Sequence, residues 1–100
     1  MSSRNARLSP DQRKRAVALP GALQAVKRAV GEGEVDAYKL RMAAIERLER
    51  EEIRVDYVEL VSAFDLQPMA VVQGEVVVAA AVFLGDVRLI DNLRIPPTAS

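Results

Sequence analysis

One stretch, "VVVAAAVFLGDVRLIDNLRI" at residues 76–95, constrains the fold of this chain more than any other. Residues 76–84 are apolar at every position, which is typical of a strand covered on both faces, in the centre of a sheet. Gly85-Asp86 follows, a pair that favours a tight turn between antiparallel strands. Residues 87–95 then alternate, with Val87, Leu89, Leu93 and Ile95 on one side and Arg88, Asn92 and Arg94 on the other. The stretch therefore predicts an antiparallel hairpin with strands at 76–84 and 87–95, and with Ala80 and Val82 buried.

Asp91 interrupts the apolar side of the second of these strands. A carboxylate in such a position usually accepts a hydrogen bond within the fold. We therefore expect a structural role for Asp91 and assign no catalytic role to it or to Asn92.

A helix is predicted over residues 10–30 from its start signal and its apolar period. Ser9 suits the N-cap, Pro10 the first helical position, and Gln12 the third, which completes a capping box. Pro20 lies inside the pattern, so we expect a kink or a break near it. The apolar stripe consists of Ala16, Leu19, Leu23, Val26 and Val30.

A second helix is predicted over residues 34–51, after a stop at Gly31-Glu32-Gly33. Its expected buried face carries Tyr38, Met42, Ile45 and Leu48. A further strand is predicted at about 55–61, although its alternation is imperfect. The connection to the hairpin holds turn residues, with one helical turn expected near residues 63–66.

These elements predict an α+β fold, with two N-terminal helices packed on a small antiparallel sheet of about three strands that ends in the hairpin. With 100 residues, half of them apolar, the chain has the length and composition of a single globular domain covering residues 1–100.

The side chains exclude several kinds of chemistry. The chain has no cysteine and no histidine, so it lacks a thiol nucleophile, the commonest general base and the commonest transition-metal ligand. No phosphate-binding glycine loop occurs. We therefore assign neither a catalytic residue nor a metal ligand. There is no apolar signal segment, and the longest apolar run has nine residues where a membrane-spanning helix needs roughly 20. We expect a cytoplasmic protein with no membrane partner.

The charges balance overall, with 14 basic and 14 acidic side chains, which argues against a dedicated nucleic-acid-binding protein. The balance is uneven along the chain, however. Residues 1–15 carry five basic side chains against one acidic one, a net charge of +4, so the other 85 residues carry −4. This basic segment suits an anion, and a nucleic-acid-binding module using it remains an alternative, although no aromatic residue lies near it.

Four segments, "MSSRN", "LSPDQR", "DYVELV" and "GDVRLIDNLRI", taken in this order and at these spacings, resemble the C-terminal domain of the pantothenate synthetase (pantoate–β-alanine ligase) family. The resemblance runs from Met1 to Ile95. One departure is Arg7, where that family usually has an aromatic residue. The family's N-terminal nucleotide-binding domain, with its two-histidine motif, is absent from these 100 residues.

The resemblance implies a function. The family joins pantoate to β-alanine through a pantoyl adenylate, at the expense of ATP with Mg²⁺. It implies that Met1, Ser2, Ser3 and Arg4 contact the ATP phosphates, while the rest of the domain acts as a lid on the nucleotide-binding domain. The isolated chain is then expected to be inactive. A free-standing interaction module is the remaining alternative. Loss of a partner domain would expose apolar surface, so self-association of the chain is also possible.

Overall fold

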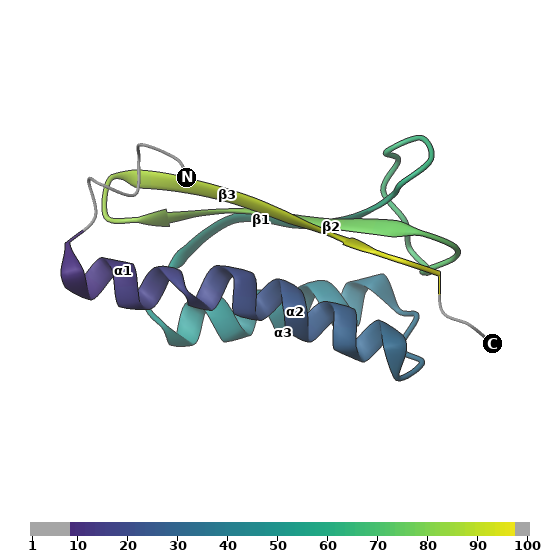
Figure 1. Cartoon of the computed structure of the whole chain (residues 1–100), viewed down its shortest axis with the longest axis horizontal. Coiled ribbons are helices and arrows are strands. Elements are labelled where there is room, and N and C mark those ends of the chain that lie inside the picture. The colour runs from purple at the N-terminus through teal and green to yellow at the C-terminus, as the bar shows by residue number, and fades with distance from the viewer. Residues whose placement is uncertain (1–8, 98–100) are drawn as a thin grey trace.

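The computed structural model describes residues 9–97 and contains two layers, one of helices and one formed by a three-stranded sheet (Figure 1). The helices cover one face of the sheet and leave the other face open. In chain order the elements are α1 (Pro10–Ala16), α2 (Ala18–Gly31), α3 (Ala37–Arg50), β1 (Arg54–Ser62), β2 (Val76–Leu84) and β3 (Val87–Ile95). The predicted α+β fold is confirmed.

The sheet has the order β1-β2-β3, and both strand pairs are antiparallel. The hairpin at its centre has the predicted boundaries, with Leu84 paired to Val87 and Val76 to Ile95. Gly85 has a φ of +62°, whereas Asp86 has no positive φ, the pattern of a type II′ turn that needs glycine at its first central position. The apolar strand β2 is central, as its composition predicts.

A bulge in β1 explains the imperfect alternation of its sequence. The register shifts between Val55 and Tyr57, which leaves Asp56 as an extra residue in the strand. The extra residue returns Val55 and Val58 to the same, helix-facing side and turns Tyr57 to the open side. Beyond β1 the predicted helical turn is a single turn, closed by the Leu66 N–H donating to the Ser62 carbonyl over 2.8 Å.

The first predicted helix is broken, and the break lies at Val17, three residues before Pro20. Proline lacks the N–H that would bond to the carbonyl four residues earlier, and its ring clashes with that carbonyl. The residue four positions before Pro20 is Ala16, where α1 ends. Pro20 therefore causes the predicted break, which lies about one helical turn before the proline itself.

The second helix starts at Ala37, three residues later than predicted, because Asp36 is its N-cap and accepts from the Tyr38 and Lys39 N–H groups. The buried face also differs from the predicted one. Tyr38 is 65% exposed and Met42 is 45% exposed, so the expectation that both belong to the core is wrong. The cap fixes the helix so that a stripe of smaller side chains meets α2 and the sheet, namely Ala37, Leu40, Ala44 and Leu48.

The core lies between the two layers and is entirely apolar in the described residues. From α2 it takes Leu19, Ala22, Leu23, Val26 and Val30, and from β2 it takes Val76, Val78, Ala80, Val82 and Leu84. Both Ala80 and Val82 are fully buried, as predicted. No helix within residues 9–97 is long and apolar enough to cross a membrane.

Candidate functional site

The residues that the sequence assigns to ATP, namely Met1, Ser2, Ser3 and Arg4, lie outside the described part of the chain. The structure describes the chain from Ser9 onward, where α1 begins. The start of α1 lies beside the β2–β3 turn. A Cβ added at Gly85 would come within 2.8 Å of the side-chain nitrogen Nε2 of Gln12. The hairpin end of the domain is therefore the end nearest to the predicted phosphate-binding segment along the chain.

The start of α1 is held in place by several polar contacts. The capping box is present: the Gln12 N–H donates to Ser9 Oγ over 3.1 Å, and the Ser9 N–H donates to Gln12 Oε1 over 3.0 Å. Arg15 then ties the helix to the end of α3, donating to the carbonyls of Glu51 and Glu52 over 3.0 and 2.6 Å. Arg15, one of the five basic residues in the first 15, thus has a structural role.

The open face of the sheet carries two rows of side chains at the hairpin end. In the row nearest the turn, Phe83 pairs with Arg88 on one side and Arg54 on the other. The Arg54 guanidinium carbon lies 4.5 Å from the centre of the Phe83 ring, within the range of a cation–π contact. Arg88 forms an ion pair with Asp56 across the sheet, with a nitrogen–oxygen distance of 2.8 Å.

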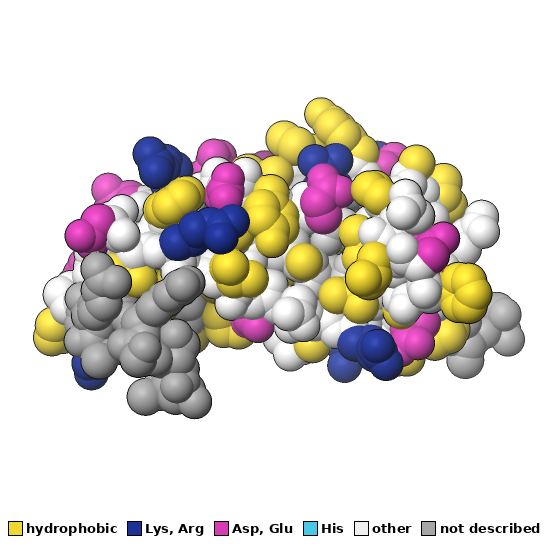
Figure 2. Space-filling model, turned by 90° about the horizontal axis from the view of Figure 1, so that it is seen from above, with side chains coloured by type: hydrophobic (Ala, Val, Ile, Leu, Met, Phe, Trp, Pro, Cys, Tyr) yellow, Lys and Arg dark blue, Asp and Glu magenta, His cyan; other side chains and the backbone are white. Residues whose placement is uncertain are grey.

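The second row is apolar and consists of Tyr57, Ala81 and Ile90. Ala81 is fully buried between its neighbours, whereas Tyr57 and Ile90 are 38% and 52% exposed. Figure 2, which looks onto this face, shows apolar side chains interspersed with basic and acidic ones.

This end of the domain offers hydrogen-bond donors and apolar surface. In residues 9–97 no group of three or more histidine, cysteine, aspartate or glutamate side chains is placed to hold a metal ion. The arginines Arg54 and Arg88 suit carboxylates or phosphates, because the planar guanidinium donates several hydrogen bonds in fixed directions. The side chains at the hairpin end of the open face thus suit the binding of an anionic group.

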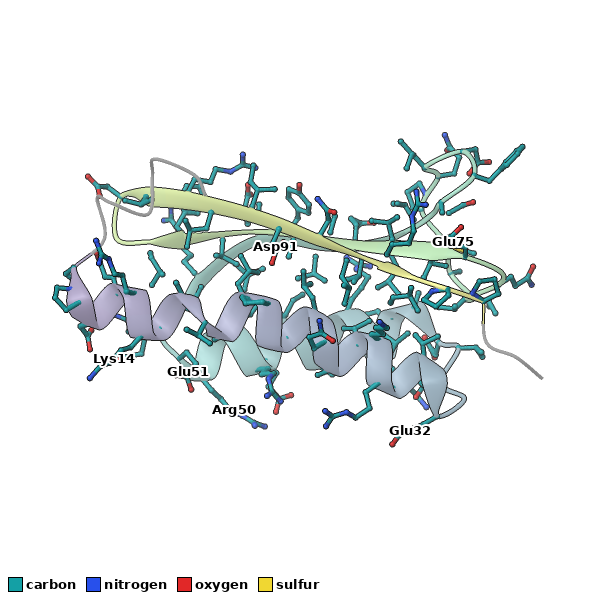
Figure 3. The ribbon with its side chains drawn as sticks, viewed as in Figure 1. Lys14, Glu32, Arg50, Glu51, Glu75 and Asp91 are labelled. Atoms are coloured by element: carbon teal, nitrogen blue, oxygen red, sulfur yellow. The ribbon has the colours of Figure 1, made fainter. Side chains whose placement is uncertain are left out.

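Asp91 has the structural hydrogen bond that the sequence predicts. Its carboxylate accepts from the backbone N–H of Asn92 over 2.8 Å. Figure 3 shows the Asp91 side chain pointing from β3 toward the helix layer, the side that carries the buried Val87 and Ile95.

Sequence reasoning missed the pairs Arg54–Phe83 and Asp56–Arg88. The members of the ion pair are 32 residues apart in the chain. No local pattern brings them together, because the contact depends on the strand register and on the bulge in β1. The only available signal was the interruption of the β1 alternation.

The outer side of the helix layer carries a groove of about 250 Å³ between α2 and α3. Its floor consists mostly of small side chains, among them Ala22, Ala25 and Ala43. Its rim holds Glu46 and Arg50, which pair with each other over 2.8 Å. Arg47 also lines the groove, so its charged lining consists of one ion pair and one further arginine.

Comparison with known proteins identifies the family. The family model described as pantoate-beta-alanine ligase matches residues 1–94. The chain belongs to the pantoate–β-alanine ligase family. The pantothenate synthetase of Anaeromyxobacter dehalogenans is 51% identical over 96 residues, which cover 96% of this chain and 33% of that protein. The pantoate–β-alanine ligase of Arabidopsis thaliana is 39% identical over 95 residues, covering 95% of this chain and 31% of that protein.

A solved structure of this family agrees with the fold. The crystal structure of the pantothenate synthetase from Thermus thermophilus superimposes with a TM-score of 0.86 at 35% sequence identity. The superposition covers 97% of this chain and 35% of that one. The chain therefore spans about a third of the length of the ligases that it matches.

Proposed function

We propose that this chain is the C-terminal lid domain of a pantoate–β-alanine ligase and works with a nucleotide-binding domain that it does not contain. The observation that carries the proposal is the family match over residues 1–94, together with the length of the relatives, of which the chain spans about a third. The names of the relatives state a ligation of pantoate and β-alanine. In the complete enzyme this ligation would consume ATP through a pantoyl adenylate.

The proposed ATP contacts are Met1, Ser2, Ser3 and Arg4. The donor set suits a triphosphate: two serine hydroxyls and the backbone N–H groups can donate to phosphate oxygens, and the arginine offsets part of the negative charge. Mg²⁺ would arrive with the ATP phosphates, and its protein ligands would belong to the rest of the enzyme.

The described residues support this role by fixing the point from which the segment extends. The capping box of Ser9 and Gln12 determines where α1 begins, and Arg15 anchors α1 to the end of α3. A segment that contacts phosphates gains from such an anchor, because the entropy of positioning it is partly lost before the ligand binds.

The lid would keep water away from the reactive acyl phosphate bond of the adenylate, which hydrolysis would destroy. It would do so without supplying a nucleophile or a base. The isolated chain is then inactive, because the groups that position pantoate and polarise the α-phosphate belong to the other domain.

A chimera tests the proposal. The 100 residues would replace the matching third of the Anaeromyxobacter dehalogenans relative, and formation of pantothenate from pantoate, β-alanine and ATP would be measured. We expect an active chimera. A triple change, Ser2→Ala, Ser3→Ala and Arg4→Ala, should raise the KM for ATP, because contacts to the bound phosphates are lost. It should also lower kcat, because contacts to phosphate oxygens strengthen as negative charge develops on them in the transition state.

Arg50→Ala is the matched control, since it also removes one arginine, here an exposed one on the outer side of α3. It should leave the kinetics unchanged. An active chimera whose kinetics are insensitive to the triple change would refute the phosphate contacts, and an inactive but folded chimera would count against the ligase function itself.

A further inference from the structure

Helix α1 has almost no hydrophobic anchor of its own. It spans only the seven residues Pro10–Ala16, and none of them is buried. Among its side chains Ala16 alone packs against the core, and it is only partly buried. A helix this short is not stable by itself in water, so contacts with the rest of the fold must hold it. The position of α1 therefore depends on polar contacts and on its junction with α2.

The junction between α1 and α2 fixes the direction of α1 only weakly. Val17 interrupts the helix there, and its side chain is 65% exposed. Pro20 has no N–H to donate to the carbonyl four residues earlier, so the helical hydrogen bonds lack one member at this point. The next bond, from the Gly21 N–H to the Val17 carbonyl, is 3.2 Å long. A further contact is needed to fix the direction of α1.

The Arg15 side chain supplies that contact. Its guanidinium donates through Nε to the Glu51 carbonyl over 3.0 Å and through Nη2 to the Glu52 carbonyl over 2.6 Å. We call these two hydrogen bonds the α1 clasp. Two bonds from one planar guanidinium fix a direction as well as a distance. Arg15 also lies 3.6 Å from the Asp11 carboxylate, but Asp11 is 79% exposed, so that ion pair adds little.

The acceptor end of the clasp belongs to a rigid part of the fold. Glu51 and Glu52 follow the last turn of α3, where the partial negative charge of a helix C-terminus favours a cation. The Ile53 N–H donates to the Leu48 carbonyl and the Glu52 N–H to the Glu49 carbonyl, the bond pattern of a Schellman motif. Leu48 and Ile53 are both fully buried in the core. The clasp therefore connects α1 to the core through α3.

We infer that Arg15 is a positioning residue for ATP binding by the ligase, an inference that rests on the proposed function. The proposed phosphate contacts at residues 1–4 precede α1 by only a few positions. By fixing the direction of α1, the clasp restricts the region that the segment in front of α1 reaches. A segment restricted in this way loses less entropy when the ligand binds. Arg15 donates to backbone carbonyls, so it acts through Ser2, Ser3 and Arg4 and not on the ligand itself.

Hydrogen exchange of the isolated chain, followed by mass spectrometry, tests the clasp itself. Arg15→Ala removes the clasp. Lys14→Ala is the matched control, because Lys14 is an exposed cation of the same helix that points away from the sheet (Figure 3). Both changes introduce alanine, so the gain in helix propensity is matched. We expect the amides of α1 to exchange at least about threefold faster in Arg15→Ala than in Lys14→Ala, and those of β2 to stay unchanged, since the core is not altered.

The kinetics of the chimera test the positioning role. Arg15→Ala should lower kcat/KM for ATP by about tenfold, because two or three side chains that the clasp restricts must then be ordered by the ligand. Lys14→Ala should leave kcat/KM unchanged. Since Arg15 acts through residues 2–4, its effect should not add to theirs. In the triple variant Ser2→Ala, Ser3→Ala and Arg4→Ala, we therefore expect Arg15→Ala to lower kcat/KM by less than about a further factor of two.

The outcomes separate this inference from the proposed function. An active chimera that responds to the triple change but not to Arg15→Ala would overturn the positioning role alone. An equal loss from Arg15→Ala in both backgrounds would also overturn it, because Arg15 would then act independently of residues 2–4. Unchanged exchange of α1 would show that the clasp does not hold the helix. An inactive but folded chimera would count against the ligase function and, with it, against any role of Arg15 in ATP binding.

Discussion

Glu52 follows the end of α3 in a left-handed backbone conformation, with a φ of 59°. L-residues adopt this conformation at a cost of roughly 1–2 kcal/mol, and glycine adopts it without one. The position is nevertheless useful, because its carbonyl accepts from Arg15 and so helps to hold α1. That contact uses the backbone and does not depend on the glutamate side chain.

We therefore expect Glu52→Gly to stabilise the chain, by up to about 1 kcal/mol after the greater entropy of glycine in the unfolded state is subtracted. Thermal melting followed by circular dichroism would measure this change. Arg47→Gly, at an exposed position inside α3, should instead destabilise the chain by about 1 kcal/mol. A lower melting temperature for Glu52→Gly would show that its side chain has a role that the structure does not reveal.

Val82 belongs to the fully buried residues of the core, where a charge would find no partner. Val82→Asp should cost more than about 3 kcal/mol, a large part of the stability of a domain of this size. Arg50→Ala removes an exposed ion pair with Glu46 and should cost well under about 1 kcal/mol. Urea unfolding would compare the two variants, and the reverse order would mean that β2 does not face the helices as described.

At the scale of the elements, the two edges of the sheet are protected in different ways. On β1 the Val58 carbonyl accepts from Arg41 Nε over 2.9 Å, and the Leu60 carbonyl accepts from the Met69 N–H over 3.0 Å. On β3 the register turns the N–H groups of alternate residues from Arg88 to Arg94 away from β2. There the Asp91 carboxylate occupies the N–H of Asn92. A charged side chain on the inner side of an edge strand is a known defence against pairing with another chain.

The position of Asp91 makes this defence specific. In the longest antiparallel register between two β3 edges, Asp91 would lie opposite the Asp91 of a second copy, and Arg88 opposite Arg94. Like charges in directly opposite positions are destabilising.

Asp91→Val should therefore shift the isolated chain toward a dimer, because it frees the Asn92 N–H and removes the charge at the centre of the register. Sedimentation velocity over a range of concentrations would detect the change. Glu49→Val, on the outer side of α3, alters the net charge equally and is the control. If both variants sediment like the wild type, the carboxylate of Asp91 does not protect the edge.

At the scale of the whole molecule, the core between the two layers makes the domain stable, whereas the ATP contacts proposed for residues 1–4 need the rest of the ligase. The isolated chain should therefore neither bind ATP tightly nor form pantothenate. Self-association of the isolated chain stays a prediction.

Isothermal titration calorimetry with ATP tests this expectation. A few hydrogen bonds to phosphate return about 0.5–3 kcal/mol each, while association costs at least about 4 kcal/mol in lost freedom of motion. The isolated chain should therefore bind ATP more weakly than about 1 mM and form no pantothenate. Micromolar binding would reveal a complete nucleotide site within these 100 residues and would contradict the lid role.

Much of the fold follows from local chemistry that the sequence displays. The hairpin has its predicted boundaries because Gly85 permits the positive φ of its turn and because the apolar run ends on both sides at turn residues. The capping box of Ser9 and Gln12 and the effect of Pro20 likewise depend only on neighbours within one turn. The family could be inferred from segments of the sequence, as the match over residues 1–94 confirms.

The tertiary structure alone decided what depends on distant parts of the chain. Tyr38 and Met42 have the spacing of core residues, yet they are exposed, because the Asp36 cap sets the phase of α3 and the close approach of α2 selects smaller side chains. The bulge at Asp56 decided that Tyr57 lies on the open face of the sheet, beside Ala81. The sequence of a single helix or strand shows its apolar periodicity and its end signals. Which face of that helix or strand becomes buried depends on how the elements pack against one another.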